Sequence, residues 1–230
     1  MAVGWNIEDA APPGLPPMPP DDWSPADVAD AAFAALRSLS ERLDLEQSPY
    51  GVDMQPEKTL QAALAEGMAA RFGVRREVHY PAAAGGSRRD GARCDLVLTQ
   101  GPPLEEAGVE PGLFDPPERT PFERACWVEV KRAGMLGPEG PDPGYAATLQ
   151  SMAVDDVIRL AADERVRHGM LLLVLFGGNG VDPGRDAERF VLECAGQGLP
   201  VGAPVVRRFR IQDRIGHEQA AICVVPVGRL

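Results

Sequence analysis

Apolar positions recur at helical spacing in the first third of the chain. Ser24-Pro25 precedes an alanine-rich stretch whose apolar residues lie three and four positions apart. This pattern predicts a helix over residues 25–45, with Ser24 as its N-cap and Pro25 in its first turn. A second pattern of the same period predicts a helix over residues 56–72, which Gly73 would stop.

Strand-like stretches come next along the sequence. Three of them, rich in β-branched and aromatic residues, predict consecutive strands over residues 74–80, 93–99 and 125–132. A Gly- and Arg-rich turn separates the first two. Residues 101–124, rich in proline and acids and without periodicity, are expected to form an inserted loop before the third. A helix over 145–166 and a continuously apolar strand over 170–176, typical of a strand buried on both faces, complete this part.

The C-terminal part predicts one more helix and a β-hairpin. The helix is expected over residues 186–195, and the hairpin strands over 205–212 and 219–227. The order of elements indicates one α/β domain over residues 25–230, with a mixed sheet flanked by helices. Within it, residues 56–176 form an α-β-β-β-α-β core. Residues 1–24 are rich in proline and are expected to be an extended segment.

The charge of the chain is strongly acidic. The 230 residues carry a formal net charge of −11, which argues against broad, non-specific coating by nucleic acid. The arginines nevertheless fall into two groups, and either could line a local basic groove or simply solvate the ends of strands. The groups are Arg75, Arg76, Arg88, Arg89 and Arg93, and then Arg207, Arg208 and Arg210.

The cysteines suggest a reducing compartment. None of the four forms a CxxC pair or lies at zinc-ligand spacing from a histidine, so buried, reduced thiols in a cytoplasmic protein are expected. No signal-peptide pattern is visible, and the longest apolar run, Met170 to Phe176, is too short to span a membrane. The cysteines are Cys94, Cys126, Cys194 and Cys223.

Candidate chemistry lies on the third predicted strand. Residues two apart in a strand share a face, so Glu129 and Lys131 point together while Val128 and Val130 point into a core. The carboxylate of Glu129 can ligate a hard divalent metal. The amine of Lys131 can position or deprotonate a water, or hold a phosphate oxygen.

Two further acids are expected near this pair. Asp95 lies early in the second predicted strand, and it lies beside Glu129 if the second and third strands form a hairpin. A bound Mg²⁺ would relieve the repulsion between these two carboxylates. On the second helix, at about 100° per residue, Glu57 shares the apolar face whereas Glu66 falls on the solvated one. Glu57 is therefore the favoured accessory acid.

This constellation resembles the PD-(D/E)XK, or restriction-endonuclease-like, nuclease superfamily. The likeness rests on Asp95, on Glu129-Val130-Lys131 and on the α-β-β-β-α-β order over residues 56–176. It implies Asp95 and Glu129 as ligands of Mg²⁺ or Mn²⁺, Lys131 as the catalytic lysine and Glu57 as the helical acid. The implied reaction is hydrolysis of a phosphodiester, in DNA rather than RNA, in restriction, phage defence or repair. Cys94 stands where the family name has a proline, and the insertion before Glu129 is long.

Two residues of the following helix complete the candidates. Related nucleases often carry a Gln or Tyr downstream of the lysine, which makes Gln150 an accessory candidate, although a solvated helix residue explains it equally well. Asp156 shares a helix face with apolar residues, so a structural role beside an arginine is expected. The three histidines support no metal site in this interpretation.

A second hypothesis belongs to another class of protein. A nuclease fold with an idle site could act as a binding or assembly subunit, with a protein partner or a second copy of the chain. Geometry discriminates between the two. An active site requires Asp95, Glu129 and Lys131 to converge, and a lysine paired away from these acids favours the idle fold.

Overall fold

The computed structural model describes most of the predicted domain. It covers residues 23–81, 92–105, 119–137, 140–178, 180–212 and 216–229. Most of the proline-rich segment, the Gly- and Arg-rich turn with Arg88 and Arg89, and the middle of the predicted insertion lie outside these ranges.

The first two helices form largely where the sequence predicts them. Helix α1 (Pro25–Leu45) begins at its proline, and the Ser24 side chain caps it by accepting a hydrogen bond from the Asp27 amide at 3.3 Å. Helix α2 (Glu57–Met68) ends earlier than predicted. The chain turns after Met68 so that Phe72 is buried against the Trp23 ring, with 5.5 Å between ring centroids. Gly73 therefore begins a strand and does not stop the helix.

Six strands form one mixed sheet in the order β1-β2-β3-β6-β8-β7. Strands β3 and β6 are parallel, and every other neighbouring pair is antiparallel. The C-terminal hairpin thus extends the sheet, as predicted. The strands are β1 (Gly73–His79), β2 (Arg93–Thr99), β3 (Cys126–Gly134), β6 (His168–Gly177), β7 (Val205–Arg210) and β8 (Gln219–Val227). A short ribbon of β4 (Leu136–Gly137) and β5 (Gly140–Pro141) follows β3.

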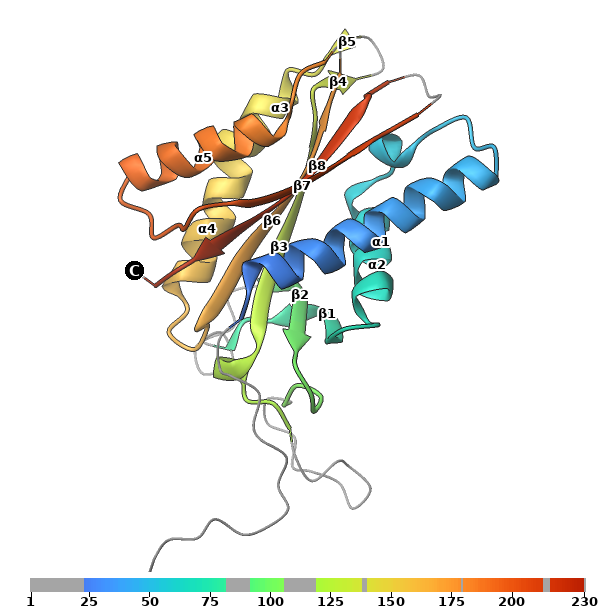
Figure 1. Ribbon diagram of the computed structural model, residues 1–230. Coiled ribbons are helices and arrows are strands. Elements are labelled where there is room, and N and C mark those ends of the chain that lie inside the picture. Colours follow the sequence, from blue (N-terminus) through green and yellow to red (C-terminus); the bar gives the residue numbers. More distant parts are fainter. Residues whose placement is uncertain are drawn as a thin grey trace, which may run out of the picture.

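Helices cover both faces of the sheet (Figure 1). Helices α1 and α2 lie on one face. On the other lie α3 (Gly144–Ala147), a π-helical segment η4 (Thr148–Met152), α4 (Ala153–Ala162) and α5 (Gly184–Gly196). The predicted helix over 145–166 is therefore three consecutive helical pieces that end at Ala162. Two single-turn 3-10 helices, η1 (Val52–Met54) and η3 (Phe122–Arg124), lie in connections.

The sheet separates two hydrophobic cores. Alternate residues of β6 enter opposite cores: Leu172 and Val174 face α1 and α2, whereas Leu171 and Leu173 face α4 and α5. The uninterrupted apolar run of β6 follows from this burial on both faces. All four cysteines are buried free thiols, as predicted, and burial raises the pKa of each.

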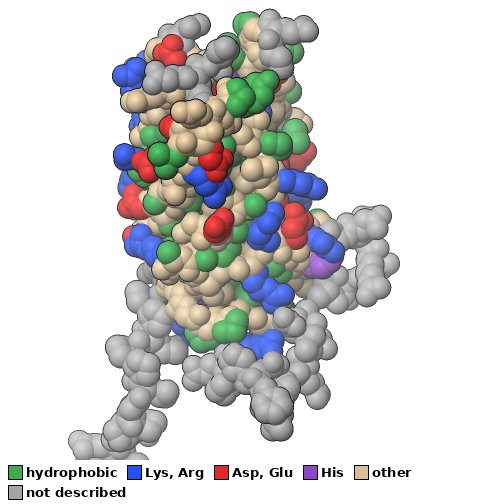
Figure 2. Space-filling view, turned by 90° about the vertical axis from the view of Figure 1, so that its right-hand side faces the viewer, with side chains coloured by type: hydrophobic (Ala, Val, Ile, Leu, Met, Phe, Trp, Pro, Cys, Tyr) green, Lys and Arg blue, Asp and Glu red, His purple; other side chains and the backbone are tan. Residues whose placement is uncertain are grey.

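Two arginines of the predicted C-terminal basic group pair with acids. Arg207 pairs with Asp30 at 2.6 Å, and Arg208 pairs with Asp182 at 2.8 Å. Figure 2 shows basic and acidic side chains intermingled over the face on the α1 and α2 side. The C-terminal arginine group therefore ties β7 to its neighbours. None of the described helices combines the length and the apolar character that crossing a bilayer requires.

Candidate active site

The strands β2 and β3 separate at the candidate site. Their ladder runs from Leu98 opposite Cys126 to Leu96 opposite Val128 and stops there. Beyond this point, two backbone N–H groups of β3 are bound by carboxylates. Oδ2 of Asp95 accepts from the Val130 amide at 2.8 Å, and Oε2 of Glu57 accepts from the Arg132 amide at 3.1 Å.

These two carboxylates therefore line one open edge of β3. Residues two apart on a strand are separated by about 7 Å, so Asp95 and Glu57 follow one another along the strand at roughly that spacing. Asp95 is partly exposed, as is Glu57, whereas Glu66 of the same helix is exposed on its other side. Glu57 therefore lies on the side of α2 that meets the sheet, as periodicity predicted.

The pairing of β1 with β2 is interrupted at the same place, without a change of register. Arg76 pairs with Leu96 and Val78 pairs with Cys94, which leaves Glu77 opposite Asp95 in the left-handed region, with φ 53°. The alternation of β2 breaks at the same place, because Cys94 and Leu96 enter opposite cores although they are two residues apart. At this interruption the Asp95 carboxylate meets the Val130 amide of β3.

Glu129 is almost fully enclosed, with 2% of its surface exposed. Its Oε1 accepts hydrogen bonds from the Tyr80 hydroxyl at 2.7 Å and from Nη1 of Arg159 at 3.1 Å. The Tyr80 ring stacks on Trp127, with 5.6 Å between centroids. Both donors use the same oxygen, and no donor among the described residues reaches Oε2.

Lys131 faces helix α4 together with Glu129. Its Nζ lies 2.9 Å from Oδ2 of Asp156, and Oδ1 of Asp156 lies 2.9 Å from Nη1 of Arg159. Arg159 in turn contacts Glu129, so acids and bases alternate from Lys131 through Asp156 and Arg159 to Glu129. Asp156 is 3% exposed and has the arginine partner expected from the sequence. We call these four side chains the charged network.

Burial and like charge perturb both acids of the charged network. The pKa of Glu129 is raised to about 8 because burial disfavours its charged form, and because the Asp156 charge and the charge and hydrogen-bonding contact of Asp95 add to this effect. The pKa of Asp156 is also raised, by burial first and by Asp95, although Lys131 and Arg159 oppose the shift.

The pKa values of the two bases of the charged network are raised, although burial alone would lower them. Burial lowers the pKa of Lys131, but the contact with Asp156 and the charges of Glu57 and Asp95 outweigh it, so the net shift is upward. The pKa of Arg159 is likewise raised by Asp156 and Glu129 against the effect of burial. Lys131 is therefore an ammonium ion at neutral pH.

The acids at this edge outnumber the bases. In the part of the chain that the structure describes, four acids lie near two cations, so two negative charges are left uncompensated when all are ionised; the acids are Glu57, Asp95, Glu129 and Asp156, and the cations are Lys131 and Arg159. This excess adds to the effect of burial in raising the pKa of Glu129. Among the described residues, no three His, Cys, Asp or Glu side chains form a group that could hold a metal. Two carboxylates completed by water and substrate oxygens are, however, a common setting for Mg²⁺.

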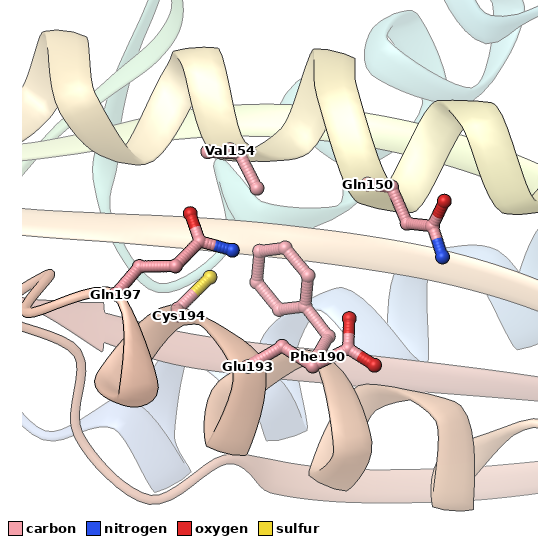
Figure 3. Close-up of a pocket in the computed structure, with 6 residues that line it drawn as sticks. All are labelled: Gln150, Val154, Phe190, Glu193, Cys194 and Gln197. Atoms are coloured by element: carbon pink, nitrogen blue, oxygen red, sulfur yellow. The ribbon is translucent and has the colours of Figure 1, made fainter.

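Gln150 lies elsewhere. It lines a surface pocket between the segment η4–α4 and helix α5, where the Phe190 ring points toward Val154 (Figure 3). No hydrogen bond or ion pair within the described residues joins Gln150 to Asp95, Glu129 or Lys131. The structure therefore does not bring the accessory candidate together with the acids.

The sequence did not predict a buried pair formed by His217 and Asp53. His217, only 1% exposed, places Nδ1 2.9 Å from Oδ2 of Asp53, and its Nε2 accepts from the Leu136 amide at 2.8 Å. The imidazole is therefore neutral, with its proton on Nδ1. Arg132 donates to the Asp53 carbonyl oxygen. This pair joins η1 to the turn before β8. The two segments lie far apart in the sequence, so no local pattern could predict the contact.

Comparison with known protein families, with curated proteins and with solved structures gives no significant match to this chain. The proposed function therefore rests on the arrangement of the side chains at the candidate site.

Proposed function

We propose that this protein is a Mg²⁺-dependent nuclease that hydrolyses phosphodiester bonds in DNA. One observation carries the proposal: Asp95 and Glu57 accept hydrogen bonds from the two backbone N–H groups of β3 that flank Lys131. The charge of Asp95 also adds to the raised pKa of Glu129. Three acids and a lysine thus gather where two strands separate. The succession α2, β1, β2, β3, α4 and β6, with β3 parallel to β6, supports a restriction-endonuclease-like core.

In this proposal Asp95 and Glu129 hold the metal. A bound Mg²⁺ would supply a water of lowered pKa and neutralise negative charge on the phosphate. The carboxylate of Glu129 must lose its proton to serve as a ligand, and the Asp95 carboxylate stands next to it. Glu57 remains hydrogen-bonded to the Arg132 amide and keeps the edge of β3 fixed.

Lys131 acts as a cation and not as a base. Its raised pKa keeps the ammonium protonated, so it can donate to the attacking water or to a phosphate oxygen but cannot accept the proton of the water. Asp156 holds that ammonium from the helix side at 2.9 Å. Of the alternatives that the sequence allowed for Lys131, this geometry favours positioning and charge stabilisation.

The experiment is cleavage of labelled single- and double-stranded DNA and RNA with Mg²⁺, with Mn²⁺ and with EDTA. Wild type is compared with Glu129→Gln and Asp95→Asn, which keep the shape of the side chains. Glu66→Gln is the control, because it removes an acid of α2 that lies on the exposed side. Metal-dependent cutting that is lost in the first two variants and kept in the control supports the proposal. Cutting that survives Glu129→Gln refutes it.

A second candidate function is favoured by the pairing of Lys131. Its ammonium contacts Asp156 of α4 and is compensated without a ligand. A site neutralised in this way suits a nuclease fold that serves as a binding or assembly subunit. Absence of cleavage by wild type under every metal condition, with no Mn²⁺ bound, would favour this function.

A further inference from the structure

Arg159 is the most exposed member of the charged network. Its side chain is 39% exposed, against 12% for Lys131, 4% for Asp156 and 2% for Glu129. It projects from α4, whereas Lys131 and Glu129 belong to β3. Of the two cations at the site, Arg159 is therefore the one that solvent and a ligand can reach more easily.

The guanidinium of Arg159 uses only part of its hydrogen-bonding capacity. Nη1 alone contacts both Oε1 of Glu129, at 3.1 Å, and Oδ1 of Asp156, at 2.9 Å. Nε and Nη2 have no acceptor within the described residues. An arginine offers five N–H donors in a planar fork that matches two phosphate oxygens. Arg159 thus has donors to spare beside a group of acids.

Arg159 also contacts a residue that is a proposed ligand of the metal. Its Nη1 donates to Oε1 of Glu129, the enclosed carboxyl group that the proposed Mg²⁺ would bind. A divalent cation at Asp95 and Glu129 and a guanidinium on the same Glu129 repel each other across a short distance. A bound metal therefore weakens the hold of Glu129 on Arg159, while Asp156 still anchors the guanidinium at one nitrogen.

We propose that Arg159 is a displaceable donor: its guanidinium is held by Glu129 and Asp156 while no metal is bound, and it binds a substrate phosphate oxygen when a divalent cation takes its place beside Glu129. The proposal rests on the proposed nuclease function and names a residue that the resemblance did not supply. It makes the phosphate contact dependent on the metal. It also predicts that loss of Arg159 moves metal affinity and phosphate affinity in opposite directions.

The test measures two affinities on the full chain. Free Mn²⁺ is counted by electron paramagnetic resonance to give the Kd of the metal. Binding of a phosphorothioate oligonucleotide, which resists cleavage, is followed by fluorescence anisotropy at saturating Mn²⁺. In Arg159→Gln we expect Mn²⁺ to bind about three- to tenfold more tightly and the oligonucleotide about five- to thirtyfold more weakly. Arg189→Gln is the matched control, because Arg189 also faces an aspartate three residues before it, on the exposed surface of α5.

Arg159→Lys keeps the positive charge but removes the planar guanidinium and its paired N–H donors. It should leave the Kd of Mn²⁺ within about twofold of wild type and still weaken oligonucleotide binding. This variant also guards against a folding defect in Arg159→Gln, which circular dichroism would reveal.

The outcomes separate this inference from the nuclease proposal. If wild type binds Mn²⁺ and cleaves while Arg159→Gln changes neither affinity, or weakens both, the inference is overturned and the nuclease stands. If wild type binds no Mn²⁺, there is nothing to displace Arg159, and both fall. If Mn²⁺ tightens in Arg159→Gln but wild type neither binds nor cleaves oligonucleotides, the phosphate role and the nuclease fall together.

Discussion

The ammonium of Lys131 on β3 and the carboxylate of Asp156 on α4 lie 2.9 Å apart in a nearly dry environment. This ion pair connects the strand that carries the candidate site to the helix that covers it. A residue chosen for its chemistry is therefore also part of the packing between sheet and helix.

Lys131→Ala should consequently cost stability as well as activity. Removing the ammonium leaves Asp156 buried with Arg159 as its remaining partner, and we expect a loss of about 1–3 kcal/mol in the free energy of unfolding. Asp156→Ala should cost a similar amount, and the double variant less than the sum of the two. Urea denaturation of the four proteins measures the coupling. Additive losses would show that the pair contributes nothing to stability.

The raised pKa of Glu129 predicts a pH dependence of stability with a definite sign. The folded protein retains a proton on Glu129 up to about pH 8, whereas the unfolded chain releases it near the ordinary value of 4.5. The folded state therefore binds more protons between these limits, and stability falls as the pH rises through them, by at most about 1.4 kcal/mol per pH unit. Asp156, whose pKa is also raised, acts in the same direction.

The check uses Glu129→Gln, which has no proton to release. In EDTA, the unfolding free energy of wild type relative to this variant should decline between pH 5 and pH 8. Parallel curves for the two proteins over that interval would mean that Glu129 titrates normally.

The pair of Asp53 and His217 should matter to the fold. Oδ2 of Asp53 accepts both the backbone N–H of His217, at 3.2 Å, and its ring N–H. Asp53→Ala leaves these two N–H donors buried without their acceptor, and it should reduce the unfolding free energy by about 2–4 kcal/mol. Burial raises the pKa of Asp53, but the His217 contacts outweigh it and lower the pKa overall.

A lowered pKa gives the opposite pH dependence from that of Glu129. The contribution of the Asp53 charge is present above the ordinary pKa of 3.8 and is lost as the pH falls below it. The stability difference between wild type and Asp53→Asn should therefore shrink between pH 5 and pH 3, as chemical denaturation can show. A difference that stays constant over this interval would exclude a charged Asp53.

Gly67 allows helices α1 and α2 to approach closely. A Cβ at this position would collide with the Cβ and Cα of Ala35. An alanine gains up to about 1 kcal/mol from helix propensity, but the clash should outweigh this gain, so Gly67→Ala should lose about 1–3 kcal/mol. Gly196→Ala, at the end of α5 with open space around it, is the control. Equal thermal stability of the two variants would disprove the close approach.

Local signals in the sequence predicted most elements and the shared face of the two candidate residues on β3. Ser24 and Pro25 located the start of α1, and alternation placed Glu129 and Lys131 on one face. Helical periodicity predicted that Glu57 lies on the side of α2 that meets the sheet. Each of these inferences needs only neighbours in the sequence.

The remaining features depend on contacts between distant segments. Arg159 meets Glu129 only because α4 packs across β3, although its spacing from Asp156, three residues, was a usable hint of a helical ion pair. The partner of His217 lies 164 positions away in the chain. The early end of α2 depends on the burial of Phe72 against Trp23, which is distant in the sequence. Helical periodicity does not reveal such a contact.

Helix α1 packs on strands β7 and β8, which lie far from it in the sequence (Figure 1). A ribosome synthesises α1 well before these strands, so the part of its apolar face that they cover stays exposed until they emerge. We therefore expect the domain to fold only after its C-terminal hairpin has emerged, and partly made chains to depend on chaperones until then.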